Sequence, residues 1–135
     1  INLKVLTFIH KKIEKIRKQV KKSKEKFKIL ILGISYKKNI DDLRESSSLK
    51  LINLLYAQKY KKVSYSDPHI KSIKSRNFSL NIKNLNLSKE NLRKFDLAVL
   101  MTDHDKFKYD LIYKNSKFII DTRGRYKVDK KVIRG

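Results

Sequence analysis

Apolar and polar residues follow two different periods along this chain, and each period predicts a different element. Between Leu6 and Val20 the apolar residues recur at steps of three and four, the spacing of one face of an α-helix, while lysines fill the other faces. This pattern predicts an amphipathic helix from about Leu3 to Lys22. The following segment, "FKILILGI" at residues 27–34, is mostly apolar and rich in β-branched residues, which is typical of a buried strand.

The remainder of the chain repeats this order of strand and helix. Serines at positions 46–48 are good N-caps, and the apolar positions that follow them predict a helix through Leu49, Ile52, Leu55 and Tyr56. Further strands are expected at 62–66, 96–101 and 117–121, and further helices at 88–93 and 107–113. The polar stretch 69–87 is expected to be irregular apart from a short strand at 78–82, and the residues after 121 to form a basic tail.

This alternation predicts a Rossmann-like α/β fold, a three-layer sandwich with a mainly parallel sheet and right-handed crossovers that place helices on both faces. The 135 residues are enough for one compact domain. We expect a connector helix at residues 1–26 and the Rossmann-like domain at residues 27–135. Because the chain begins with Ile1 rather than methionine, we expect a fragment or separated domain of a longer protein.

The chain carries a formal net charge of +22, from 35 basic and 13 acidic residues. A field of this strength attracts polyanions, so the charge admits a basic module that binds nucleic acid or an anionic membrane surface. The excess is nevertheless spread along the sequence, with one dense run from Lys11 to Lys28, and no aromatic motif of RNA-binding sheets is present. A lysine-rich bias in the amino-acid composition is therefore the favoured explanation of the charge, and we expect no nucleic-acid or membrane partner. The alternative is a basic module on a Rossmann-like scaffold that binds nucleic acid or an anionic membrane surface.

The sequence also argues against cysteine-based sites, metal sites, membrane spans and a signal peptide. The chain has no cysteine, which excludes disulfides, thiolate zinc sites and a cysteine nucleophile within it. His10, His69 and His104 have no metal-ligand spacing, so no metal is expected. No apolar run approaches the roughly 20 residues of a membrane span, and the lysine-interrupted N-terminus does not have the pattern of a signal peptide. The default location is cytoplasmic.

Ligands of open α/β sheets bind beyond the carboxyl ends of the strands, which here are followed by residues 35–48, 102–106 and 121–125. These segments are distant in sequence, and a parallel sheet should bring them to one edge. The convergence of the three segments predicts a ligand site at that edge.

The first of these segments is not a dinucleotide cradle, because the motif G-x-G-x-x-G needs three glycines and only Gly33 is available. Side chains and the following helix N-terminus would have to hold a phosphate, and Lys37 and Arg44 suit that role. On the pattern alone, a surface salt-bridge cluster between these cations and the acids at positions 41, 42 and 45 is an equal alternative.

Four segments resemble, in order and spacing, the C-terminal domain of the UDP-glucose/GDP-mannose dehydrogenase family. They are "LGISYKKNIDDLRESSSLKLINLL", "YSDPHI", "LAVLMTDHDKFKYD" and "FIIDTRGRY". The resemblance spans residues 28–126, and the run 33–48 is its most specific part. The first helix is similar to the end of the long central helix of that family. Tyr36 and Lys38 depart from the Phe and Pro that many relatives carry, but neither change removes a contact group.

The resemblance implies an activity and a set of contacts. Enzymes of this family oxidise the C6 alcohol of a nucleotide-linked sugar to a carboxylate in two NAD-dependent steps, with a covalent adduct on a cysteine at the aldehyde stage. By matching motif, Lys37 and Arg123 would bind the UDP-sugar and Arg44 would reach toward the cofactor. NAD would be bound mainly by an N-terminal domain absent from this chain, so we expect no catalytic residue here and no activity of the chain alone. A homodimer is expected by analogy with the family.

Three details stay open. The substrate would be UDP-glucose or a UDP-N-acetylhexosamine, and the motifs "TDHD" and "DDLRES" lean toward the second. For His104 a structural role in a turn is favoured over ligand contact. Asp67, which would hold a ribose in a dinucleotide fold, is interpreted mainly as part of a turn with Pro68, since the glycine fingerprint is missing.

Overall fold

The computed structural model describes residues 3–35, 38–39, 46–70 and 84–135. Nine helices and strands lie in these ranges: α1 (Leu3–Gln19), β1 (Lys28–Leu32), α2 (Ser47–Ala57), β2 (Lys62–Ser66), α3 (Lys89–Arg93), β3 (Leu97–Leu100), α4 (Tyr109–Asn115), β4 (Ile119–Asp121) and β5 (Val132–Arg134). The strand expected at 78–82 falls outside the described residues.

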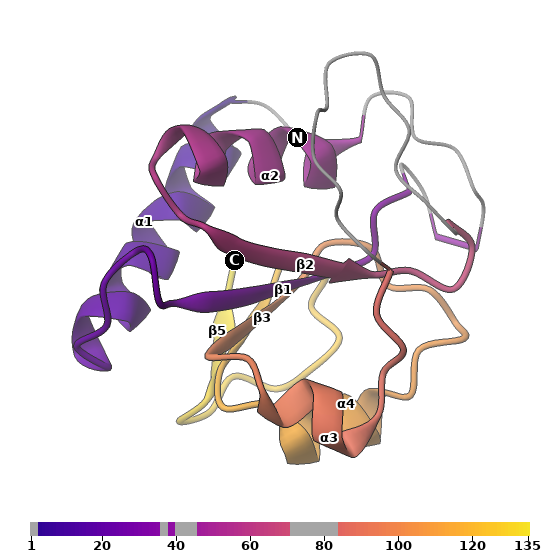
Figure 1. Cartoon of the computed structure of the whole chain (residues 1–135). Coiled ribbons are helices and arrows are strands. Elements are labelled where there is room, and N and C mark those ends of the chain that lie inside the picture. The colour runs from indigo at the N-terminus through magenta and orange to yellow at the C-terminus, as the bar shows by residue number, and fades with distance from the viewer. Residues whose placement is uncertain (1–2, 36–37, 40–45, 71–83) are drawn as a thin grey trace.

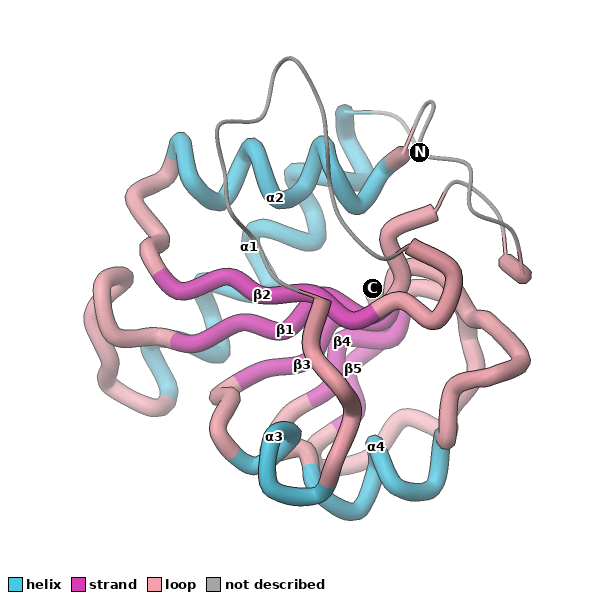
Figure 2. The backbone as a smooth tube through the Cα atoms, turned by 45° about the vertical axis from the view of Figure 1, so that its right-hand side comes forward, coloured by secondary structure: helices cyan, strands magenta, loops and turns pink. Residues whose placement is uncertain are grey.

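The strands form one parallel sheet in the order β2-β1-β3-β4-β5. Helices α1 and α2 cover one face, and α3 and α4 cover the other, as both views of the backbone show (Figures 1 and 2). The Rossmann-like three-layer sandwich predicted from the alternation of elements is therefore confirmed. Because every strand runs in the same direction, all carboxyl ends meet at one edge of the sheet, and all amino ends meet at the opposite edge.

The chain after residue 121 is not simply a basic tail, and that expectation is wrong. Val132 pairs with Ile119 and is fully buried, so β5 extends the sheet beyond β4. The turn before β5 is held by Asp129, whose Oδ1 accepts hydrogen bonds from the backbone N–H groups of Lys131 and Val132. The pattern missed this strand because three residues among lysines are too few to show a period.

The apolar stripe of α1 belongs to the main core. Its buried residues Leu6, Ile9, Ile13 and Ile16 share one cluster with the inner residues of β1 and α2. A second cluster fills the space between the other face of the sheet and α3 and α4. The first helix therefore packs on the sheet, and the boundary at residue 26 between a connector helix and a domain stays a prediction.

Candidate functional site

The three loops expected to converge at the carboxyl edge contact one another. Thr102 donates its hydroxyl hydrogen to the carbonyl oxygen of Ser35 at 2.9 Å, which joins the loop after β3 to the loop after β1. Asn39 and Asp105 are joined by two hydrogen bonds of 2.8 and 2.9 Å. Arg123, after β4, donates from Nε to Asp103 Oδ1 at 3.1 Å. The convergence predicted from the sequence is therefore confirmed for the described parts of these loops.

Gly33 is required by close packing at this edge. Its φ of +89° lies in the left-handed region, and a Cβ at this position would be 2.5 Å from Cβ of Thr102. The backbone of β1 therefore turns directly against the end of β3, with no space left between them for a side chain at position 33. The carbonyl of Gly33 accepts a hydrogen bond from the Ser48 hydroxyl at 2.6 Å, which ties the turn to the start of α2.

Asp67, at the end of β2, is a buried carboxylate that organises the turn after β1. Its Oδ2 accepts from the backbone N–H groups of Ile34 and Ser35 at 2.7 and 3.1 Å. Its Oδ1 accepts from two more backbone N–H groups, those of His69 and Ile70, at 2.7 and 3.2 Å. Burial alone would raise the pKa of Asp67, but the hydrogen bond from His104 and those from the backbone hold it below its ordinary value.

His104 joins the loops after β1, β2 and β3. The imidazole is fully buried, and its Nε2 lies 2.9 Å from Oδ2 of Asp67 and 3.0 Å from Oγ of Ser35. Its Nδ1 accepts the backbone N–H of Asn39 at 2.7 Å, so the ring proton of the neutral form is on Nε2 and is directed at the carboxylate. Both ring nitrogens are thus bonded within the protein, which agrees with the structural role favoured for this residue.

The turn after β4 presents arginine side chains outward. Asp121 accepts the backbone N–H groups of Arg123 and Gly124 on Oδ1, both at 2.9 Å, and that of Tyr126 on Oδ2 at 2.8 Å. The side chain of Arg123 is 45% exposed while it contacts Asp103. The guanidinium of Arg125 lies 4.2 Å from the ring centre of Tyr109, whose pKa burial raises to about 12. This edge therefore offers planar cations to an anionic or aromatic ligand.

A pocket of about 400 Å³ opens elsewhere on the same edge, between the end of β2 and the loop that leads into α4. Its lining includes Asp67, Asn84, Leu85, Lys106 and Phe107. The side chain of Asn84 is already bonded to the backbone of Asp67 and Ile70. The pocket does not include Arg123, so it is separate from the turn after β4 (residues 121–126), which carries Arg123 and Arg125 and which we call the arginine turn.

The described ranges hold neither a metal cluster nor a membrane-spanning helix. No group of three or more His, Asp or Glu side chains there could hold a metal ion. In the same part of the chain, no helix combines the length and the apolar character that crossing a bilayer requires.

Residues 30–128 match the sequence model of the UDP-glucose/GDP-mannose dehydrogenase family, UDP binding domain. The chain belongs to this family. Among its relatives is an NDP-N-acetyl-D-galactosaminuronic acid dehydrogenase of Ralstonia solanacearum, 32% identical over 118 residues that cover 87% of this chain and 27% of the relative. A UDP-N-acetyl-D-mannosamine dehydrogenase of Methanococcus vannielii is 37% identical over 107 residues, which cover 73% of this chain and 23% of the relative. The chain thus spans about a quarter of the length of these dehydrogenases.

Solved structures of the family share the fold. The UDP-D-ManNAc dehydrogenase of Pyrococcus horikoshii superposes with a TM-score of 0.71 at 22% identity, over 92% of this chain and 28% of that one. The GDP-mannose dehydrogenase of Pseudomonas aeruginosa superposes with a TM-score of 0.64 at 20% identity, over 90% of this chain and 30% of that one. The three-layer sandwich described above is therefore the architecture of a family domain.

Of the residues predicted to bind ligands in this family domain, the structure describes Arg123, on the outer side of the arginine turn. Lys37 and Arg44 lie outside the described residues. The neighbouring Lys38 is described, and its Nζ lies 3.7 Å from Oδ1 of Asp105. Sequence reasoning missed Asp103 as the partner of Arg123, although the motif "TDHD" places two carboxylates directly after β3, where they meet the loop after β4.

Proposed function

We propose that this chain is the nucleotide-sugar-binding part of an NAD-dependent dehydrogenase that oxidises the C6 alcohol of a UDP-sugar to a carboxylate. The observation that carries the proposal is the match of residues 30–128 to the UDP binding domain of the family. The names of the relatives support an N-acetylhexosamine as the sugar, in line with the motifs "TDHD" and "DDLRES". The alternative sugar is glucose.

In this proposal the carboxyl edge of the sheet receives the UDP group. Arg123 supports it because its guanidinium is exposed where the loops after β3 and β4 meet, and a planar fork can grip a phosphate or the carbonyl oxygens of uracil. Lys37 would act as a point charge on the nucleotide sugar, and Arg44 would reach toward the cofactor. Both of these roles follow from the family motifs.

The described residues do not fit the pyrophosphate of NAD. The space in front of Gly33 is filled by Thr102, and the carboxylate of Asp67, which could hold a ribose, is occupied by backbone N–H groups and His104. The proposal therefore assigns NAD, which would accept the hydride, to another domain of the full enzyme. The chain has no cysteine for the aldehyde stage, so the proposal also includes that it is inert alone.

Calorimetric titration of the 135-residue chain with UDP tests the proposed site. Saturable binding of one UDP is expected, and Lys37→Ala or Arg123→Ala should each weaken it about tenfold or more, since a hydrogen bond to a charged group contributes about 1.5–3 kcal/mol. Lys130→Ala, at the opposite edge of the sheet, is the control and should leave the affinity unchanged. An unaltered UDP affinity in both test variants, with folding intact, would refute the site.

A homodimer, expected by analogy with the family, and a cytoplasmic location, the default that the sequence suggests, belong to the same proposal. On α1, the side chains of Leu3 and Phe8 are 76% and 52% exposed, which offers apolar surface for contact with a second copy or another domain of the enzyme. Sedimentation of the chain with and without Phe8→Asp would show whether that surface holds a dimer together.

A further inference from the structure

The fold gathers lysines from distant segments at the edge where all five strands begin. We call this the amino edge and define it by the residues that lead into or open the strands: 21–28, 59–62, 94–96, 117 and 129–131. These segments carry twelve lysines against three acids, which are Glu25, Asp96 and Asp129. The lysines are Lys21, Lys22, Lys24, Lys26, Lys28, Lys59, Lys61, Lys62, Lys94, Lys117, Lys130 and Lys131.

The described part of the opposite edge is nearly balanced. Its loops and strand ends in that part, residues 33–35, 38–39, 67–70, 101–108, 121–126 and 134–135, carry six basic and four acidic residues. The basic ones are Lys38, Lys106, Lys108, Arg123, Arg125 and Arg134, and the acidic ones are Asp67, Asp103, Asp105 and Asp121. Among the described residues, a charge excess that is spread along the sequence is therefore concentrated at the amino edge, and a biased composition alone does not account for this difference.

Contacts within the amino edge show that its segments lie together. The buried carboxylate of Asp96 lies 2.6 Å from Nζ of Lys22 and 4.0 Å from Nζ of Lys117, and it accepts the backbone N–H of Lys28 at 2.9 Å. Lys28 and Lys62 face each other as paired residues of β1 and β2. Within the described part of the chain no ion pair involves Lys26, Lys59, Lys61, Lys62, Lys94 or Lys130. Their charges are available to an external anion.

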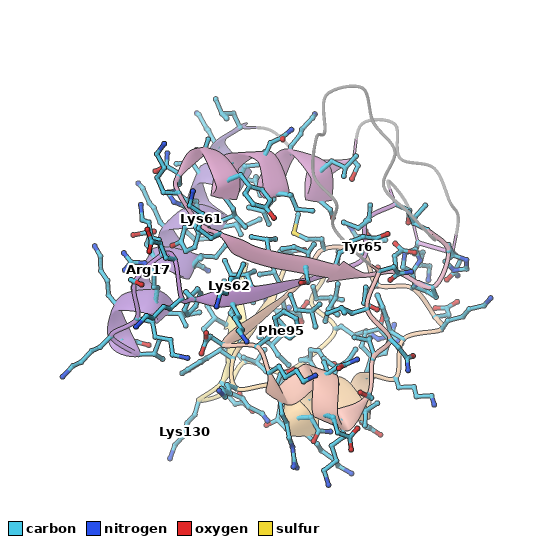
Figure 3. The ribbon with its side chains drawn as sticks, in the orientation of Figure 1. Arg17, Lys61, Lys62, Tyr65, Phe95 and Lys130 are labelled. Carbon is cyan, nitrogen blue, oxygen red and sulfur yellow. The ribbon has the colours of Figure 1, made fainter. Side chains whose placement is uncertain are left out.

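The arrangement favours a flat partner. Lysines project from the turns after α1 and α2, from the first residues of β1 and β2, and from the segments that follow α3 and α4, so all three layers contribute. In Figure 3, Arg17, Lys61, Lys62 and Lys130 lie on the same side of the molecule. Tyr60 and Phe95, the aromatic residues next to these lysines, are 0% and 8% exposed, so they offer no stacking platform for nucleic-acid bases. Lysine is a flexible point charge that suits mobile headgroups.

We propose that the amino edge docks this domain on the surface of an anionic lipid bilayer. Each lysine near such a surface adds to the attraction, and no apolar insertion is needed. The carboxyl edge, with its arginines, then faces away from the bilayer and stays open to solvent. The proposal does not depend on nucleotide binding, because the two edges share none of these residues.

Co-sedimentation with vesicles tests the proposal, with the 135-residue chain at an ionic strength of roughly 0.15 M. Binding is expected to vesicles that mix phosphatidylglycerol with phosphatidylcholine, and not to vesicles of phosphatidylcholine alone. The test variant is Lys61→Gln with Lys62→Gln, and the matched control is Lys106→Gln with Lys108→Gln at the other edge, since all four side chains are exposed. The test variant should bind anionic vesicles on the order of tenfold more weakly, while the control should bind like the parent chain.

Three outcomes would overturn the proposal. The first is an absence of binding to anionic vesicles. The second is an equal loss of vesicle affinity in both double variants, which would show that only the overall charge matters. The third is tighter binding of the parent chain to a DNA duplex of unrelated sequence than to anionic vesicles at the same salt, which would assign the amino edge to nucleic acid. Circular dichroism confirms that each variant is folded. The test variant should bind UDP with the affinity of the parent chain, so a failure of the membrane proposal can be told from a failure of the proposed function.

Discussion

Replacing Asp67 by asparagine tests whether this carboxylate holds the carboxyl edge together. The side chain keeps its size but exchanges one oxygen for an amide group, which is a donor. If the remaining oxygen keeps the bonds from Ile34, Ser35 and His104, the new amide faces the backbone N–H groups of His69 and Ile70. Two donors, one buried (Ile70) and one partly buried (His69), then lose their acceptor, at about 1–3 kcal/mol for a buried one. We expect the Asp67→Asn chain to lose about 3 kcal/mol of unfolding free energy after partial relaxation.

Urea unfolding followed by circular dichroism measures this loss, provided that a single cooperative transition is seen in both chains. Asp105→Asn is the matched control. Its carboxylate is on the same edge, but its side chain is 62% exposed, so its replacement should change the unfolding free energy by no more than about 0.5 kcal/mol. A loss below about 1 kcal/mol for Asp67→Asn, or an equal loss for the control, would refute the reasoning.

Two further substitutions and one pH dependence test the same structure. Gly33→Ala should destabilise the chain by about 2 kcal/mol or more in urea unfolding, because the new Cβ meets Thr102 and the backbone keeps a positive φ; wild-type stability would contradict the packing described. Because α1 is part of the core, Ile13→Ala should lower the unfolding free energy by about 2–5 kcal/mol, whereas replacing the exposed Lys15 by alanine should change it very little. The pKa of Asp67 is lowered in the folded chain, so its contribution to the unfolding free energy is complete above its ordinary pKa of 3.8 and is lost as the pH falls through the lower folded pKa. Below about pH 4 the unfolding free energy of Asp67→Asn should therefore fall less steeply with pH than that of the parent chain.

The helices and strands were predictable where burial leaves a clear pattern of apolar residues in the sequence. The strands near 28–32 and 97–100 are buried on both faces of the sheet and stand out as apolar runs, and the stripe of α1 recurs at helical spacing. The start of α4 was predicted two residues early, since Phe107 is apolar but packs in the turn beside His104 and the helix begins at Tyr109. Strand β5 was missed because its place in the sheet depends on pairing with β4.

The meeting of the three loops at one edge was predictable from topology, but their contacts were not. Knowledge that strands alternate with helices was enough to expect the three loops at one edge. The bond between His104 and Asp67 joins residues from two strand ends, and no sequence period marks it. The lysine-rich character of the amino edge is likewise visible only in space, because lysines that are dispersed along the chain come together when every strand points the same way.

The network around Asp67 also explains why nucleotide recognition at the proposed UDP site would depend on side chains. In glycine-rich nucleotide folds, the backbone N–H groups of the first turn face the phosphates. Here the corresponding groups, those of Ile34 and Ser35, donate to Oδ2 of Asp67, so an anion from the chain itself occupies the place of a phosphate. A bound nucleotide cannot use these donors without displacing the carboxylate. In the proposed site its negative charge would instead be met by cationic side chains, and Arg123, which contacts Asp103 and stays 45% exposed, is the described candidate.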